Sequence, residues 1–173
     1  MIEGKKDTQT VTPDGRRVAK LIAGVSVRQA ITHEDERGEL CEIYDPAWGV
    51  LDAPLVYVYQ TSIRPGRLKG WVFHKQQTDR LFASMGVLKI VLFDLRDDSP
   101  TKDLLNEIFL SERNRGLLVI PPYVAHAVQN VGDTEAVFIN MPTRPYNHTD
   151  PDKFRISFES GRIPYSFDRG LGW

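Results

Sequence analysis

The sequence predicts an all-β protein, built as an antiparallel sandwich or barrel with little helix. Short β-branched and aromatic runs recur along most of the chain, and turn residues separate them every dozen or so residues. Many short strands of this kind are typical of a sandwich or a barrel. No segment carries a long helical stripe, and only residues 101–106 could form a helical turn.

Length and composition indicate a single domain. The chain has 173 residues, of which 41% are hydrophobic and 26% charged, and this is enough for one buried core. Residues 1–18 are polar and are expected to form an N-terminal arm, and residues 19–173 one domain. The lone cysteine, Cys41, excludes an intrachain disulfide and a Cys-based zinc site.

Charge and hydropathy exclude two classes of partner. The formal net charge is −1, so the chain has no overall attraction for nucleic acid. No apolar run approaches the roughly 18 residues that a membrane helix requires. The polar N-terminus shows no signal peptide, and we therefore expect a soluble, cytoplasmic protein.

Turn and strand signals divide the chain into short elements. Residues 33–38 are expected to form a charged turn. A hairpin is expected over residues 80–95, with its bend at Gly86. The other strands are expected at residues 18–25, 39–44, 55–61, 68–74, 106–110, 117–120, 127–131, 135–141 and 154–158.

Two of the four histidines have positions that suit the interior of a barrel. His74 ends an apolar strand, and His126 follows the proline pair at residues 121–122. Since alternate residues of a strand share a face, regular pleating places His74 with Val72 on one face and Lys69 on the other.

A metal site is one interpretation of these histidines. A catalytic zinc or iron site usually needs three protein ligands, and His74, His126 and Asp79 form a conceivable set. Structural histidines are more common than ligands, so we expect no metal.

Basic residues gather in one window of the sequence. Their functional interpretation is an anion site, since arginine and lysine bind phosphate groups. Basic side chains also protect exposed strand edges, so the pattern alone has two explanations. The window contains Arg64, Arg67, Lys69, Lys75 and Arg80.

Three motifs resemble the dTDP-4-dehydrorhamnose 3,5-epimerase family. Residues 35–42 resemble its D-x-R-G-x-x-x-E segment, and residues 94–101 its D-x-R-x-x-S-P-T run. Residues 110–126 resemble its L-S-x-x-N and I-P-x-G-x-A-H motifs. The resemblance implies a cupin-type jelly roll, a homodimer, a dTDP-linked keto sugar as substrate, and no metal or other cofactor.

The family's reaction assigns expected roles to several residues. It moves a proton next to a 4-keto group, which requires a base, an acid and a cation at the enolate oxygen. The position of the family's base is Val72 in this chain, and Lys69 replaces the arginine that supplies the cation. We hypothesise that His74 is the base, because the similar sugar 3,4-ketoisomerases carry G-x-H-x-H-K. Tyr146 resembles the family's general acid, and Asp168 the aspartate that orients its histidine.

Further residues are expected to bind the substrate. Arg80 corresponds to a phosphate contact, and Arg37 is expected to act across a dimer interface. The set implied by the resemblance is Arg37, Glu42, Gln60, Arg80 and His126. Val72 also favours an alternative, a cupin that binds a nucleotide sugar without turning it over, with His74 only binding the ligand.

Overall fold

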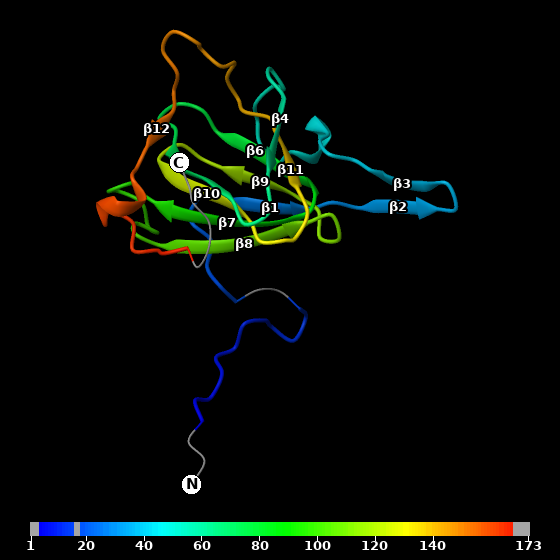
Figure 1. The fold of residues 1–173 in the computed structure, drawn as a ribbon, viewed down its shortest axis with the longest axis horizontal. Coiled ribbons are helices and arrows are strands. Elements are labelled where there is room, and N and C mark those ends of the chain that lie inside the picture. The colour runs from blue at the N-terminus through cyan, green and yellow to red at the C-terminus, as the bar shows by residue number, and fades with distance from the viewer. Residues whose placement is uncertain (1–3, 16–17, 168–173) are drawn as a thin grey trace.

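Strands form almost all of the regular structure in the computed structural model, which describes residues 4–15 and 18–167 (Figure 1). One sheet has the order β1-β9-β6-β11-β4 and a second has the order β12-β5-β10-β7-β8. All pairings are antiparallel. The first sheet contains β1 (Ser26–Gln29), β4 (Tyr59–Ile63), β6 (Asp79–Met85), β9 (Gly116–Ile120) and β11 (Ala136–Asn140). The second contains β5 (Leu68–Phe73), β7 (Val87–Asp94), β8 (Leu105–Ser111), β10 (Val124–Asn130) and β12 (Phe154–Arg155).

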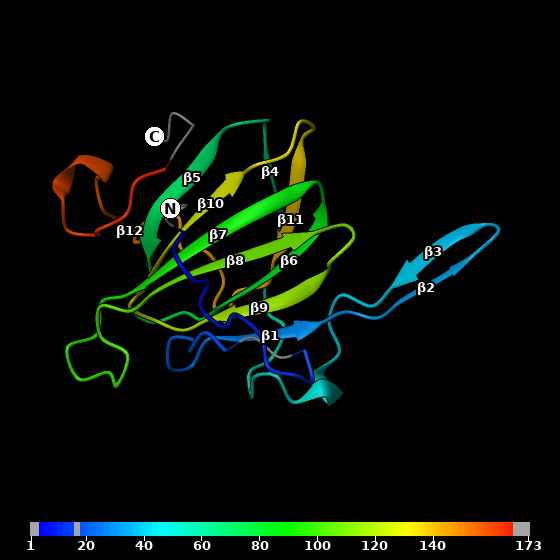
Figure 2. The same ribbon diagram turned by 90° about the horizontal axis from the view of Figure 1, so that it is seen from below.

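A separate hairpin and two short 3₁₀ helices complete the described elements. The hairpin pairs β2 (Thr32–Asp35) with β3 (Gly38–Cys41) and projects from the side of the two sheets (Figure 2). The helices are η1 (Pro46–Trp48) and η2 (Phe158–Ser160). The prediction of an all-β fold with little helix is therefore confirmed.

The main core lies between the two sheets because each strand turns alternate residues inward. Leu81 and Ala83 of β6 pack in one hydrophobic cluster with Val124 and Val128 of β10. The intervening Phe82 belongs to a different cluster on the outer face. The same alternation points two polar residues into the space between the sheets, Asp79 on β6 and His126 on β10.

Other segments of the chain cover the outer faces of both sheets. Residues 41–50 pack on Phe82 of the first sheet. Residues 156–167 pack on the second sheet around Trp71, which is 2% exposed. Apolar segments therefore cover the outer face of each sheet. Part of the space between the two inner faces stays open as a cavity.

A break in register on β5 changes which residues face inward. Val72 lies opposite His126, but Lys69 lies opposite Val128, so one residue of β10 between these pairs faces two residues of β5. A bulge of this kind reverses the alternation of faces. The prediction that Lys69 faces away from His74 is therefore wrong, because both line the same cavity.

Most predicted strands are present, with some shifts. The strand expected at residues 18–25 is absent, and β1 begins only at Ser26. The turn expected at residues 33–38 overlaps β2, which runs from Thr32 to Asp35. The helical turn expected at residues 101–106 does not extend over its last two residues, because β8 begins at Leu105. Residues 4–15 run away from the sheets (Figure 1), and the division into an arm and a domain stays a prediction. Within the described ranges, no helix is long and apolar enough to cross a membrane.

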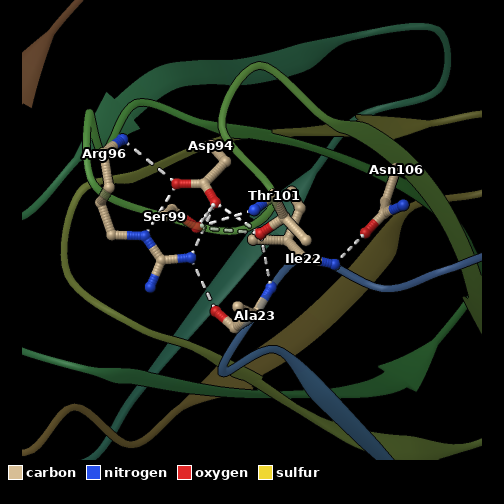
Figure 3. Close-up of polar contacts among 7 residues, drawn as sticks. All are labelled: Ile22, Ala23, Asp94, Arg96, Ser99, Thr101 and Asn106. Carbon is tan, nitrogen blue, oxygen red and sulfur yellow. Dashed lines mark hydrogen bonds and ion pairs between the residues drawn. The ribbon is translucent and has the colours of Figure 1, made fainter.

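The D-x-R-x-x-S-P-T run forms a polar cluster that attaches the N-terminal segment to the sheets (Figure 3). The buried carboxylate of Asp94 accepts hydrogen bonds from Ser99 Oγ at 2.6 Å and Thr101 Oγ1 at 2.7 Å, and pairs with Arg96 Nε at 2.7 Å. Arg96 also donates to the carbonyl oxygen of Ala23, and Ala23 N donates to Thr101 Oγ1. In this structure the motif therefore holds the fold together and does not line the cavity.

We predict that the Asp94 cluster makes stability depend on pH in acid. Burial alone would raise the pKa of Asp94, but hydrogen bonds from Arg96, Ser99 and Thr101 outweigh it and lower the pKa to about 2. This stabilisation, about 2 kcal/mol, is present above the ordinary pKa near 4 and is lost as the pH falls through the folded-state value. The free energy of unfolding in urea should be higher for the wild type than for Asp94→Asn at pH 6, and this gap should narrow at pH 2. A gap that is equal at both pH values would contradict the assignment.

Candidate active site

A cavity of about 500 Å³ lies between the sheets. Strands β4, β5, β6, β10 and β11 supply its walls, and residues 142–155 close one side. This volume is within the usual range of small-molecule sites, roughly 300–1,000 Å³. The cavity therefore has room for a metabolite-sized ligand.

Two histidines and one aspartate meet in this cavity. The Nε2 atom of His74 lies 3.3 Å from Oδ2 of Asp79, and the Nε2 atom of His126 lies 3.5 Å from the same oxygen. All three side chains are at most 10% exposed. The candidate ligand atoms of the three residues lie within 4.8 Å of one another. We call these three residues the His–Asp–His cluster.

The other ring nitrogens of both histidines face backbone carbonyls. Nδ1 of His74 contacts the carbonyl oxygen of Asp152, and Nδ1 of His126 lies 3.3 Å from that of Val124. Gln77 Nε2 donates to Oδ1 of Asp79 at 2.8 Å, which fixes the carboxylate. Each nitrogen of both rings therefore faces an acceptor oxygen.

Burial and mutual charge shift the pKa values of the cluster in different directions. Burial would lower the pKa of His74, but Asp79 and the Asp152 carbonyl outweigh it and raise the pKa. Burial would raise the pKa of Asp79, but the two histidines lower it to about 2. Burial is the main reason that the pKa of His126 falls to about 4. The cluster thus combines a carboxylate, a readily protonated imidazole and a neutral one.

Asp152 holds the chain that follows β5. Its carboxylate accepts hydrogen bonds from the backbone N–H groups of Lys75, Gln76 and Gln77 at 2.8–2.9 Å. Burial would raise the pKa of Asp152, but these donors outweigh it and lower the pKa. Because the same residue contacts Nδ1 of His74, it fixes both the loop and the imidazole.

Basic and aromatic side chains form the rest of the wall. Lys69, Arg144, Lys153 and Arg155 supply positive charge. Burial is the first cause, and Arg155 the second, of a lowered pKa at Lys153. Tyr59 is also in the wall, and burial together with the Asp79 charge raises its pKa to about 12. The cavity therefore has an anionic centre in the cluster and cations elsewhere along its wall.

Four residues predicted from the sequence are brought together in this cavity. They are Lys69, His74, His126 and Tyr146. Tyr146 lies on the loop after β11 and contacts the ring of His148 edge-on, with centroids 4.9 Å apart. The structure does not test their chemical roles, which stay proposals.

Arg80 does not occupy the predicted phosphate-binding position. Its side chain is fully buried, and its guanidinium donates to the carbonyl oxygens of Ala53, Pro54 and Met141 and to the hydroxyl of Tyr44. A guanidinium satisfied in this way attaches the segment before β4 to β6. It does not line the cavity, so we drop the phosphate role.

The remaining predicted binding residues lie outside the cavity wall. Gln60 is on β4, but its neighbours Tyr59 and Thr61 face the cavity. Glu42 follows the β2–β3 hairpin, and Arg37, at the hairpin's turn, pairs with Asp35 at 2.5 Å. Asp168 lies outside the described residues.

Several wall residues were not identified from the sequence. Asp152, Lys153 and Arg155 come from the segment leading into β12, and Tyr57 and Tyr59 from the segment at β4. The alternation of Tyr57 and Tyr59 was a usable signal, since two residues two apart share a face. The charges at 152–155 have no such local pattern.

Comparison with known proteins places the chain in a family. The family model described as dTDP-4-dehydrorhamnose 3,5-epimerase matches residues 19–167. The spore coat polysaccharide biosynthesis protein SpsL of Bacillus subtilis (strain 168) is 32% identical over 148 residues, 86% of this chain and 97% of that protein. A probable low-salt glycan biosynthesis epimerase, Agl13 of Haloferax volcanii, is 31% identical over 80% of this chain and 89% of its own length.

A solved structure shows the same fold. The dTDP sugar isomerase from Desulfovibrio desulfuricans G20 is 27% identical, with a TM-score of 0.74, and the match covers 86% of this chain and 94% of that one. The fold and the collinear motifs agree with the family match. This chain is therefore an enzyme of the sugar-nucleotide epimerase and isomerase type and belongs to the dTDP-4-dehydrorhamnose 3,5-epimerase family.

Proposed function

We propose that this enzyme binds a dTDP-linked 4-keto-6-deoxy sugar in the cavity and moves a proton at a carbon next to the ketone. The observation that carries the proposal is the joint presence, in one cavity, of the His–Asp–His cluster, Tyr146 and a group of cations. Proton transfer next to a ketone needs groups that exchange protons and a positive charge for the enolate oxygen.

The wall offers a residue for each part of such a substrate. Lys153 and Arg155 both line the cavity, and after burial the charge of Arg155 is the second cause of the lowered pKa of Lys153. Two neighbouring cations of this kind suit a diphosphate. Lys69, on β5, supplies the cation for the enolate oxygen. Tyr146 is 44% exposed at the cavity wall and supplies the proton donor.

We propose that His74 takes part in the proton transfer, but the contacts of its two ring nitrogens limit how it can do so. Nδ1 faces the Asp152 carbonyl, and Nε2 faces Asp79 at 3.3 Å. For His74 to act as the base itself, Nε2 has to turn from Asp79 toward the sugar.

We also propose that the active protein is a homodimer. The β2–β3 hairpin projects from the sheets (Figure 2), and its flanks expose Ile31 at 65% and Leu40 at 62%. Arg37, at the turn of this hairpin, is then positioned to act on the partner chain. Light scattering of the purified chain should give twice the mass of one 19.7 kDa chain.

Deuterium exchange tests the proposed reaction. We expect the protein, incubated in deuterated water with a dTDP-linked 4-keto-6-deoxy sugar, to place deuterium at a carbon flanking the ketone. Proton NMR would locate the exchanged carbon. Binding of the sugar nucleotide without any exchange would favour the alternative, a binding protein without turnover.

A further inference from the structure

We propose that His74, Asp79 and His126 bind a divalent transition metal ion, and that zinc is the ion their geometry favours. Nothing in the comparisons assigns a metal to this chain. The inference goes beyond the proposed function and does not depend on it, since metal binding is measured without substrate.

The spacing of the three side chains fits metal coordination better than direct hydrogen bonding. Hydrogen bonds between an imidazolium and a carboxylate are short, about 2.7–2.9 Å. The two Nε2 atoms instead lie 3.3 Å and 3.5 Å from Asp79 Oδ2. Ligands bound to zinc at about 2.0–2.2 Å in a tetrahedron are about 3.3–3.5 Å from each other. Both Nε2–Oδ2 distances match that edge, and all three candidate ligand atoms lie within 4.8 Å of one another.

The hydrogen bonds around the cluster orient both rings as metal ligands. A metal-binding histidine usually donates its other N–H to a carbonyl or a carboxylate. Here Nδ1 of His74 contacts the Asp152 carbonyl, and Nδ1 of His126 faces the Val124 carbonyl at 3.3 Å. In the neutral tautomer with its proton on Nδ1, each ring directs its Nε2 lone pair at Asp79 Oδ2. A cation between these three atoms takes the place of the proton that Nε2 of His74 otherwise holds toward Asp79.

The surroundings also support a buried ion. Gln77 Nε2 donates to Asp79 Oδ1 at 2.8 Å, so the second oxygen of the carboxylate stays directed at the histidines. Asp79 is 5% exposed on its side chain, and the histidines are 10% and 8% exposed. Two histidines and one carboxylate form a recurrent set for a catalytic metal that keeps an open position.

A metal at this place changes the role of His74. Val72 lies opposite His126 and supplies no fourth ligand, so three protein ligands leave a position for an oxygen from the cavity. A ketone oxygen is suited to that position, where the ion would polarise it as a Lewis acid. His74 then serves the reaction as a ligand, and the proton passes through another group.

Metal content and titration test the site. The full chain, with its affinity tag removed, should contain about one zinc per chain by mass spectrometry after growth in zinc-supplemented medium. After chelation, zinc chloride alone should bind at one equivalent by calorimetry, and cobalt(II) should give the visible absorption of a tetrahedral site. His126→Gln and Asp79→Asn should lose this binding by at least 100-fold. The matched controls His33→Ala and His148→Ala remove the other two histidines and should bind zinc as the wild type does.

The wild type alone can overturn the inference, even if the cluster variants fail to fold. A folded wild type that neither retains zinc nor binds zinc or cobalt at one equivalent would show that the cluster is a hydrogen-bonded group without metal. Zinc binding that is equal in folded cluster variants would place the ion elsewhere. Neither result bears on deuterium exchange, so the proposed function would stand or fall separately.

Discussion

His74→Ala is expected to lower the rate of deuterium exchange at the keto sugar by about 10³-fold. The substitution removes the imidazole nearest to Asp79 in the cavity, 3.3 Å from its carboxylate. The loss is expected whether His74 acts as a base or as a metal ligand, because a base takes the proton next to the ketone and a metal ligand holds the ion that would polarise the ketone. The rate is measured by NMR at saturating substrate.

Asp133→Ala is the control for this variant. Asp133 is exposed in the turn between β10 and β11 and lies outside the cavity wall, so its removal should leave the exchange rate unchanged. Because His74 is buried, the His74→Ala protein must also show a cooperative thermal transition and bind dTDP. Exchange at the wild-type rate in the folded variant would remove His74 from the reaction.

Gly70→Ala is expected to destabilise the fold by at least about 3 kcal/mol. Gly70 has φ +124°, and an added Cβ would lie 2.6 Å from both the Cα of Ala127 and the carbonyl oxygen of His126. Both atoms belong to the backbone of β10, so neither moves without breaking the pairing that places His126. Urea unfolding measures the change.

Gly66→Ala separates backbone strain from this close contact. Gly66 has φ +69°, but no atom lies within 4 Å of its added Cβ. It should therefore lose only about 1 kcal/mol. Equal losses in the two variants would show that the close approach of β5 to β10 has little effect on stability.

Strands rich in apolar residues were predictable from the sequence. The short apolar runs of β5, β6 and β7 are bounded by turn residues and are mostly buried. The sequence Thr-His-Glu-Asp of β2 is exposed throughout and carries no alternation, so it was interpreted as a turn. β10 begins at Val124, two residues after Pro122, whereas the sequence predicted this strand only from residue 127 because prolines interrupt strands.

The candidate site was predictable only where single residues carry the chemistry. His74 and His126 were found because histidine is rare in this chain and both lie at apolar strands. The inward position of Lys69 depends on the bulge opposite β10, which no local pattern in β5 reveals. Arg80 was misassigned because its partners are carbonyl oxygens at residues 53, 54 and 141, far away in the sequence.

Asp79 and Asp152 show what three-dimensional proximity adds. Asp79 was considered only as a conceivable metal ligand, and the structure places it between both histidines. Asp152 is 78 residues from His74 in the sequence, and it contacts the ring and fixes the loop after β5. Such long-range pairs follow from the topology of the sheets and the return of the chain at β12.

A crystal structure of the protein with bound dTDP-glucose, an unreactive sugar without a ketone, tests the central claim most directly. We predict that the hexose lies inside the cavity, between Tyr146 and the His–Asp–His cluster, with the diphosphate on Lys153 and Arg155. A nucleotide sugar bound outside this cavity, or with its hexose directed to solvent and away from the cluster, would contradict the account.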